Sequence, residues 1–171
     1  MKNYVEDIKA INNSIIETFP IEIAQENEIF CLPASLQALI NYHSGGVISQ
    51  MDLFNQMNRS PSFGTASSLR IKGFHFEVKY PETFEEWKSI IQMEVILKKP
   101  VTISTRVNPN AVHIRVAIGV TNKSFLLYNP GANLENGRII SSKEEYFFQD
   151  AENNWNLPNK CGDLLLCTYI S

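Results

Sequence analysis

Residues 25–40 read Gln-Glu-Asn-Glu-Ile-Phe-Cys-Leu-Pro-Ala-Ser-Leu-Gln-Ala-Leu-Ile, a polar segment followed by an apolar one. Apolar side chains recur at helical spacing after Cys31, and the pattern predicts a helix over 32–43. Pro33 falls in the first turn, where a helix tolerates proline because those backbone N–H groups have no partner within the helix. Cys31 is therefore expected at the start of a helix, with Gln25 six residues before it.

The rest of the chain changes from a helical to a strand-like pattern near residue 100. We predict helices over 4–18, from Ser49 through Met57, over 66–72 with Thr65 as its cap, and over 83–97 with Thr83 as its cap. Strands are predicted at 74–80, 100–107, 113–120, 124–129, 137–140 and 164–170. Helices followed by an antiparallel sheet indicate an α+β fold, and a cleft between the two halves is the natural place for a site.

Length and charge limit the classes of protein. The chain has 171 residues, 44% of them hydrophobic, so a single domain over 1–171 can bury its own core. The net charge is -3, and the longest basic run is the pair Lys98-Lys99. Nucleic acid is therefore an unsuitable partner.

The amino end is polar and lacks the apolar stretch of a secretory signal. No apolar run approaches the ~20 residues needed to cross a bilayer, so no membrane insertion is expected. The sequence thus favours a cytoplasmic protein, or one exported by a route without a cleaved signal peptide, and it leaves the oligomeric state open.

Two later residues complete a set that could carry out chemistry. His113 begins an apolar strand and Asn129 ends the next one. If residues 121–123 form the connecting loop, Asn129 faces residue 113 or 115, and directly opposed side chains lie roughly 5 Å apart. Gln, Cys, His and Asn in this order are the parts of a cysteine-dependent acyl-transfer site.

Each of the four residues has a predicted role. Cys31 is the nucleophile, and a helix N-terminus together with an imidazolium of His113 would stabilise its thiolate. His113 is the base, and Asn129 holds the ring in position. Gln25 would bind the oxyanion together with the backbone N–H of Cys31.

The chain resembles the papain-like cysteine peptidases, and more closely the bacterial branch that includes the leader peptidases of bacteriocin exporters and their stand-alone relatives. The resemblance covers nearly the whole chain. Its landmarks are Gln25 through Cys31-Leu-Pro, Val-Ile-Ser-Gln-Met-Asp-Leu-Phe, Phe-Gly-Thr-Ala-Ser-Ser-Leu, Gly-Phe-His-Phe-Glu-Val, Thr-Phe-Glu-Glu-Trp, Lys-Lys-Pro-Val-Thr-Ile-Ser, His-Ile-Arg-Val-Ala-Ile-Gly-Val and Tyr-Asn-Pro-Gly.

The resemblance implies a papain-like fold and a thiol protease. It carries the oxyanion glutamine onto Gln25, the nucleophile onto Cys31, the base onto His113 and the orienting residue onto Asn129. Two positions depart from the pattern: Leu32 stands where relatives usually have glycine, and Asn129 stands where this branch often has aspartate. The resemblance does not identify the substrate, because the same scaffold serves peptidases, deamidases and acyltransferases.

Three hypotheses on function follow. The first is a hydrolase that cleaves amide bonds of a peptide or protein without a cofactor. The second is a deamidase or acyltransferase with the same site, and the third is a non-catalytic peptide-binding domain. Product mass would separate the first two, and loss of Cys31 or His113 would have favoured the third.

Other reactive residue types have structural interpretations. The cysteines are odd in number and widely spaced, so neither a disulfide framework nor a metal site is expected, although a bridge between Cys161 and Cys167 stays open. His43 at a helix end and His75 in an alternating strand are both interpreted as structural. Trp155 either covers the His113 and Asn129 pair or belongs to the core.

Overall fold

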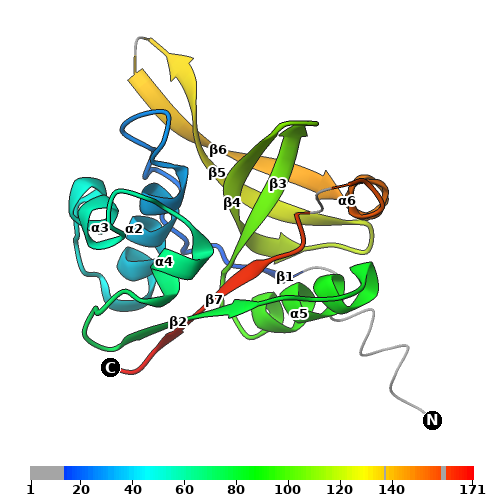
Figure 1. Ribbon diagram of the computed structural model, residues 1–171, viewed down its shortest axis with the longest axis horizontal. Helices are drawn as coiled ribbons and strands as arrows, with labels where there is room; N and C mark the ends of the chain where they lie inside the picture. The colour runs from blue at the N-terminus through cyan, green and yellow to red at the C-terminus, as the bar shows by residue number, and fades with distance from the viewer. Residues whose placement is uncertain (1–13, 137, 159–160) are drawn as a thin grey trace.

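The computed structural model describes residues 14–136, 138–158 and 161–171, which form one antiparallel sheet with helices on both sides (Figure 1). The main strand order is β2-β7-β3-β4-β5-β6, and β1 pairs with β4. The elements are β1 (Ser14–Ile15), α2 (Cys31–Ser44), α3 (Gln50–Gln56), α4 (Phe63–Ser67), β2 (Phe74–Lys79), α5 (Phe84–Ile96), β3 (Val101–Asn108), β4 (Ala111–Val120), β5 (Ser124–Glu135), β6 (Arg138–Phe147), α6 (Phe148–Trp155) and β7 (Leu164–Tyr169). The predicted α+β class is confirmed.

The sheet is covered on both faces. Figure 1 shows α2, α3 and α4 on one side and α5 and α6 on the other. Side chains alternate along β4, so Val116 and Ile118 join the core under α2 and Ala117 joins the core under α5. A register shift between Ala117 and Gly119 interrupts the alternation and places Val120 in the α5 core as well. Burial on both faces explains why this strand is apolar without interruption from residue 116 to residue 120.

Helix α2 runs through the first core. Its buried positions include Leu36, Leu39 and Ile40, as the helical spacing predicts. The helix ends at Gly45, which has φ +67° and donates its N–H to the carbonyl of Asn41. Glycine adopts this left-handed conformation without steric cost, so the glycine terminates the helix.

Three short-range caps fix the other helices of the amino half. Ser49 accepts a hydrogen bond from Asp52 N–H and Thr83 accepts one from Glu86 N–H, both as predicted. The predicted helix over 66–72 with Thr65 as its cap is wrong. The helix in this region is α4, Phe63–Ser67, and its cap is Ser62. Thr65 is the third helical residue, and its hydroxyl accepts from Ser62 N–H in a capping box.

The amino end also differs from its prediction. Residues 4–13 of the predicted helix lie outside the described residues, and Ser14–Ile15 form β1, paired with Val120 and Gly119. The pairing of β3 with β4 stops at Ala117, so the edge of β4 beyond it is available. Strand pairing at this edge therefore overrides the helical spacing of the isoleucines.

Helix α6 was not predicted, and β5 and β6 are longer than predicted. No helix in the described ranges is long and apolar enough to span a membrane.

Candidate active site

The register of β4 and β5 brings His113 and Asn129 together. Val116 pairs with Tyr128, so the next residue of β5, Asn129, comes opposite Arg115 and diagonal to His113. The Asn129 Oδ1 atom lies 2.6 Å from His113 Nε2. The predicted pairing of these two residues is confirmed.

The neighbours of Asn129 fix which way its amide points. Gly131 N–H donates to Asn129 Oδ1 at 2.8 Å, and Asn129 Nδ2 donates to Glu144 Oε1 at 2.6 Å. The oxygen therefore faces His113, and an amide oxygen can only accept. His113 Nε2 must carry the proton, which leaves Nδ1 of the neutral ring free to accept one.

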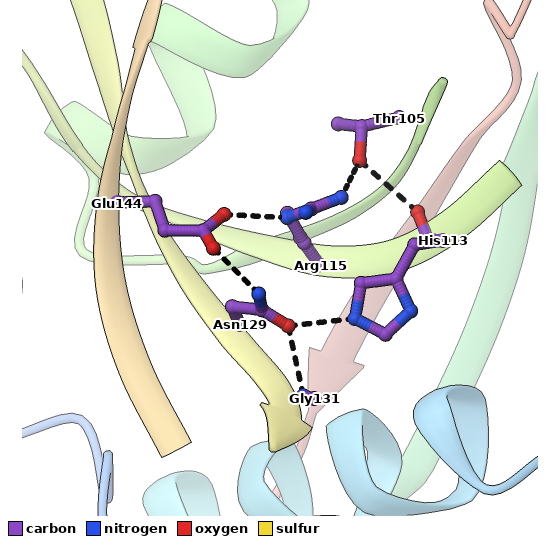
Figure 2. A network of polar contacts seen from close by, with 6 residues as sticks. All are labelled: Thr105, His113, Arg115, Asn129, Gly131 and Glu144. Carbon is purple, nitrogen blue, oxygen red and sulfur yellow. Dashed lines mark hydrogen bonds and ion pairs between the residues drawn. The ribbon is translucent and has the colours of Figure 1, made fainter. Parts of the chain in front are cut away.

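An ion pair supports this arrangement from behind (Figure 2). Arg115 Nε lies 2.7 Å from Glu144 Oε2, and Arg115 Nη1 donates to Thr105 Oγ1. The Thr105 hydroxyl in turn donates to the carbonyl of His113 at 3.2 Å. The Arg115 and Glu144 ion pair and its hydrogen bonds thus connect the four strands β3, β4, β5 and β6 around the His113 and Asn129 pair.

Gly131 lies against the same pair. A Cβ atom on this residue would be 2.7 Å from His113 Nε2 and 2.8 Å from Asn129 Oδ1. Only glycine fits there without moving the ring or the amide. Trp155 lies against Gly162 and near Trp87, away from this pair. It packs against the core under α5, in agreement with the second of its two interpretations.

The Cys31 thiol lies beside the strand that carries His113. Backbone N–H groups of Ile114, Leu32 and Cys31 itself face the sulfur. Burial raises the pKa of the Cys31 thiol, and these amides together with the charge of Arg115 act in the opposite direction. The expected stabilisation of a thiolate is therefore outweighed by burial, and the thiol is protonated at rest.

His113 is neutral at rest for the same reason. Burial lowers the pKa of His113, the hydrogen bond that His113 donates to Asn129 opposes that shift, Arg115 lowers the pKa further and Glu144 raises it. A protonated thiol and a neutral imidazole are a different resting state from the thiolate and imidazolium expected from the sequence. Such a pair can still react, because the imidazole can take the thiol proton as the sulfur attacks.

Gln25 lies beside the segment that follows Asn129. Its backbone N–H donates to the carbonyl of Pro130 at 2.9 Å, which joins it to the segment after Asn129. Its side chain is 8% exposed, and Nε2 donates to the carbonyl of Asn27 at 3.0 Å. Among the described residues, Oε1 of Gln25 has no hydrogen-bond partner.

A buried residue of α3 holds the backbone on both sides of Gln25. Gln50 is 1% exposed; its Oε1 accepts from Glu26 N–H at 2.9 Å and its Nε2 donates to the carbonyl of Ala24 at 2.8 Å. Gln50 Nε2 also donates to Gln37 Oε1 on α2. Sequence reasoning missed this residue, because a glutamine in the first turn of a helix gives no sign of contacts 24 and 26 positions away.

The thiol opens into a cleft of about 520 Å³. Its walls come from the start of α2, from α4 and the residues before it, and from the strands β2, β3 and β4. The lining residues are Ile29, Cys31, Leu32, Pro61, Ser62, Phe63, Gly64, Val78, Tyr80, Ser104, Val112, Ile114 and Asp163. The predicted cleft between helices and sheet is present.

The remaining reactive residues lie apart. Cys161 and Cys167 are free thiols, and His43 packs edge-on against Tyr42 and Phe74. His75 is exposed on β2. Within 14–136, 138–158 and 161–171, no three His, Cys, Asp or Glu side chains gather in a way that could hold a metal ion.

The match to a known family agrees with this geometry. A model of the Peptidase_C39-like family matches residues 17–161, which include Gln25, Cys31, His113 and Asn129. The chain belongs to the Peptidase_C39-like family. No curated protein matches the sequence significantly.

Two solved structures of C39 peptidase domains share the fold. One is the peptidase domain of Streptococcus ComA, a bifunctional ABC transporter involved in quorum sensing, with 14% identity, a TM-score of 0.58, and coverage of 86% of this chain and 97% of that one. The other is a C39-like peptidase candidate from Bacillus anthracis, with 16% identity, a TM-score of 0.58, and coverage of 94% and 98%. The Peptidase_C39-like chain thus has the papain-like cysteine peptidase fold that the sequence predicted.

Proposed function

We propose that this Peptidase_C39-like protein is a cysteine-dependent hydrolase that cleaves amide bonds of a peptide or protein. The observation that carries the proposal is the His113–Asn129 hydrogen bond of 2.6 Å, with the next residue of the same strand, Ile114, donating its N–H toward the Cys31 sulfur. These residues come from positions almost 100 apart in the chain, and they form the three-part arrangement of nucleophile, base and orienting group.

The first half of the reaction uses the neutral pair. The proton of the Cys31 thiol passes to His113 Nδ1 while the sulfur forms a bond to the amide carbonyl carbon. The backbone N–H of Cys31 and the side-chain amide of Gln25 stabilise the resulting oxyanion. The carbon–nitrogen bond then breaks, and His113 returns its proton to the leaving amine.

The second half releases the acyl group. A water molecule gives a proton to His113 and attacks the thioester, and the sulfur leaves as the carbon–sulfur bond breaks. The proton on His113 then returns to the Cys31 sulfur, so the site is restored with one water consumed. Asn129 keeps Nδ1 aimed at the reacting atoms throughout, because its oxygen holds the other nitrogen.

The proposal is tested by alkylation and by product mass. We expect iodoacetamide to label Cys31 faster in the wild type than in His113→Ala, as located by peptide mass spectrometry, because the imidazole accepts the thiol proton. A peptide mixture should then show new cleavage products with the wild type and none with Cys31→Ala. Equal labelling in both proteins would contradict the proposal.

The same mixture separates the other reactions on this scaffold. A gain of about one dalton without cleavage would identify a deamidase, since an amide NH₂ is exchanged for OH. Joined peptides would identify an acyltransferase. Binding of peptides without any covalent change would leave the non-catalytic domain.

A further inference from the structure

We propose that the cleft beside Cys31 binds the acyl part of the substrate, which is the part before the scissile bond. The cleft favours a bulky apolar side chain in that part, together with a basic residue two or three positions before the scissile bond. This inference rests on the proposed function and adds the substrate class.

The apolar preference comes from the lining of the cleft. Eight of its side chains are aliphatic, aromatic or proline: Ile29, Leu32, Pro61, Phe63, Val78, Tyr80, Val112 and Ile114. Ile29, Tyr80 and Val112 are 60%, 68% and 56% exposed, although each is a large hydrophobic residue. Exposed apolar side chains that converge on one cleft mark a binding surface rather than a core.

The basic preference comes from Asp163, the one charged residue that lines the cleft among the residues that the structure describes. Asp163 is exposed and directly precedes Leu164, which pairs with Ile103 of β3, so Asp163 comes beside Ser104. Ser104 in turn pairs with Ile114 of β4. Asp163, directly before β7, therefore lies in a row with Ser104 of β3 and Ile114 of β4.

The row gives an approximate position for the charge. Ile114 is the residue whose N–H faces the Cys31 sulfur, and Asp163 lies two strands away, or about 10 Å at the usual strand spacing. An extended peptide advances about 3.4 Å per residue, so this distance corresponds to two or three residues. A lysine or arginine at that position can reach the carboxylate.

The direction of the row assigns it to the acyl part. The leaving amine takes its proton from His113, and the His113 ring is held by Asn129 of β5. Strands β3 and β7 lie beyond the opposite edge of β4. The cleft thus leads away from the side on which the amine departs, and the residues before the scissile bond occupy it.

The test uses peptidyl acyloxymethyl ketones, which alkylate a thiol at the methylene carbon and release a carboxylate. Matched probes carry Lys or Glu at the second or third position before the ketone, next to Leu or Gly. The rate constant for modification of Cys31 is measured by mass spectrometry in the wild type, Asp163→Asn and Asp163→Lys. Glu152→Lys, an exposed charge change on α6 away from the cleft lining, is the control, and iodoacetamide measures the reactivity of the thiol itself.

We expect the wild type to prefer the Lys probe over the Glu probe by about fivefold, the size of a well-formed exposed ion pair. The preference should vanish in Asp163→Asn, reverse in Asp163→Lys and persist in Glu152→Lys, and Leu probes should react faster than Gly probes. The inference alone would be overturned if the wild type reacted equally fast with the Lys and Glu probes, or if Asp163→Lys kept the wild-type preference, while iodoacetamide labelling stayed normal. Labelling that is equally slow in the wild type and His113→Ala would overturn the proposed function and the inference with it.

Discussion

Replacing Gly131 by alanine would test how closely the His113 and Asn129 pair must be held. The new Cβ would lie 2.7 Å from His113 Nε2, whereas non-bonded heavy atoms prefer about 3.5 Å, so the ring has to move by roughly 0.8 Å. That movement lengthens the 2.6 Å hydrogen bond to Asn129 to as much as about 3.4 Å, beyond the usual range for such a bond. A displacement near 1 Å at reacting groups costs about 10²-fold, and we expect a 10- to 100-fold slower reaction.

The assay is the rate constant for modification of Cys31 by a peptidyl acyloxymethyl ketone at pH 7, with the melting temperature measured in parallel. Overpacking by one methyl group costs about 1–3 kcal/mol, so the variant should stay folded with a slightly lower Tm. Gly46→Ala is the matched control: its Cβ would lie 2.9 Å from the Ser44 hydroxyl, the end of an exposed side chain that can rotate away. It should react at the wild-type rate.

The reasoning would be refuted by a folded Gly131→Ala protein that reacts as fast as the wild type. Such a result would mean that the ring is not held by Asn129 when Cys31 reacts. The reasoning would also be refuted if Gly46→Ala lost as much rate as Gly131→Ala. The effect would then come from stability and not from the position of the ring.

Three further predictions concern the surroundings of the site. Gln50→Met should lower kcat for peptide cleavage by up to about 10²-fold with little change in iodoacetamide labelling, because it frees the backbone around Gln25. An equal loss of kcat and of the labelling rate would contradict this. The part of the iodoacetamide labelling rate that depends on His113 should be lost only below about pH 6.5, the ordinary pKa of histidine. Burial lowers the pKa of His113, so the neutral ring that accepts the thiol proton persists as the pH falls. Glu144→Gln should move that limit to still lower pH, since Glu144 raises the pKa of His113, whereas Glu145→Gln should leave it in place; a shift to higher pH would show the sign to be wrong.

The residues proposed to react could be selected from the sequence because each has a local pattern. Cys31 opens a helix whose apolar spacing is unambiguous, and the strands of His113 and Asn129 are joined by a short turn that sets their register. Local rules were sufficient to place His113 and Asn129 within hydrogen-bonding distance. The caps at Ser49 and Thr83 followed from the same kind of rule.

The supporting residues could not be found in this way. Glu144 lies on β6, whose length was underestimated, and its contact with Arg115 depends on pairing across two strand boundaries. Gln50 contacts a segment far away in the chain. The sequence predicts a stabilised thiolate at Cys31, whereas burial raises the pKa of this thiol in the fold. A helix start is visible in a sequence, but the depth of burial is set by the whole fold.

The protonation of the Cys31 thiol has a consequence for the sensitivity of the protein to oxidation. Hydrogen peroxide oxidises thiolates to sulfenic acid and reacts slowly with thiols. Because burial raises the pKa of Cys31, the resting protein should resist this oxidation at neutral pH. Its sulfur becomes vulnerable only in the short interval in which its proton has passed to His113, and purification should therefore need little protective reductant.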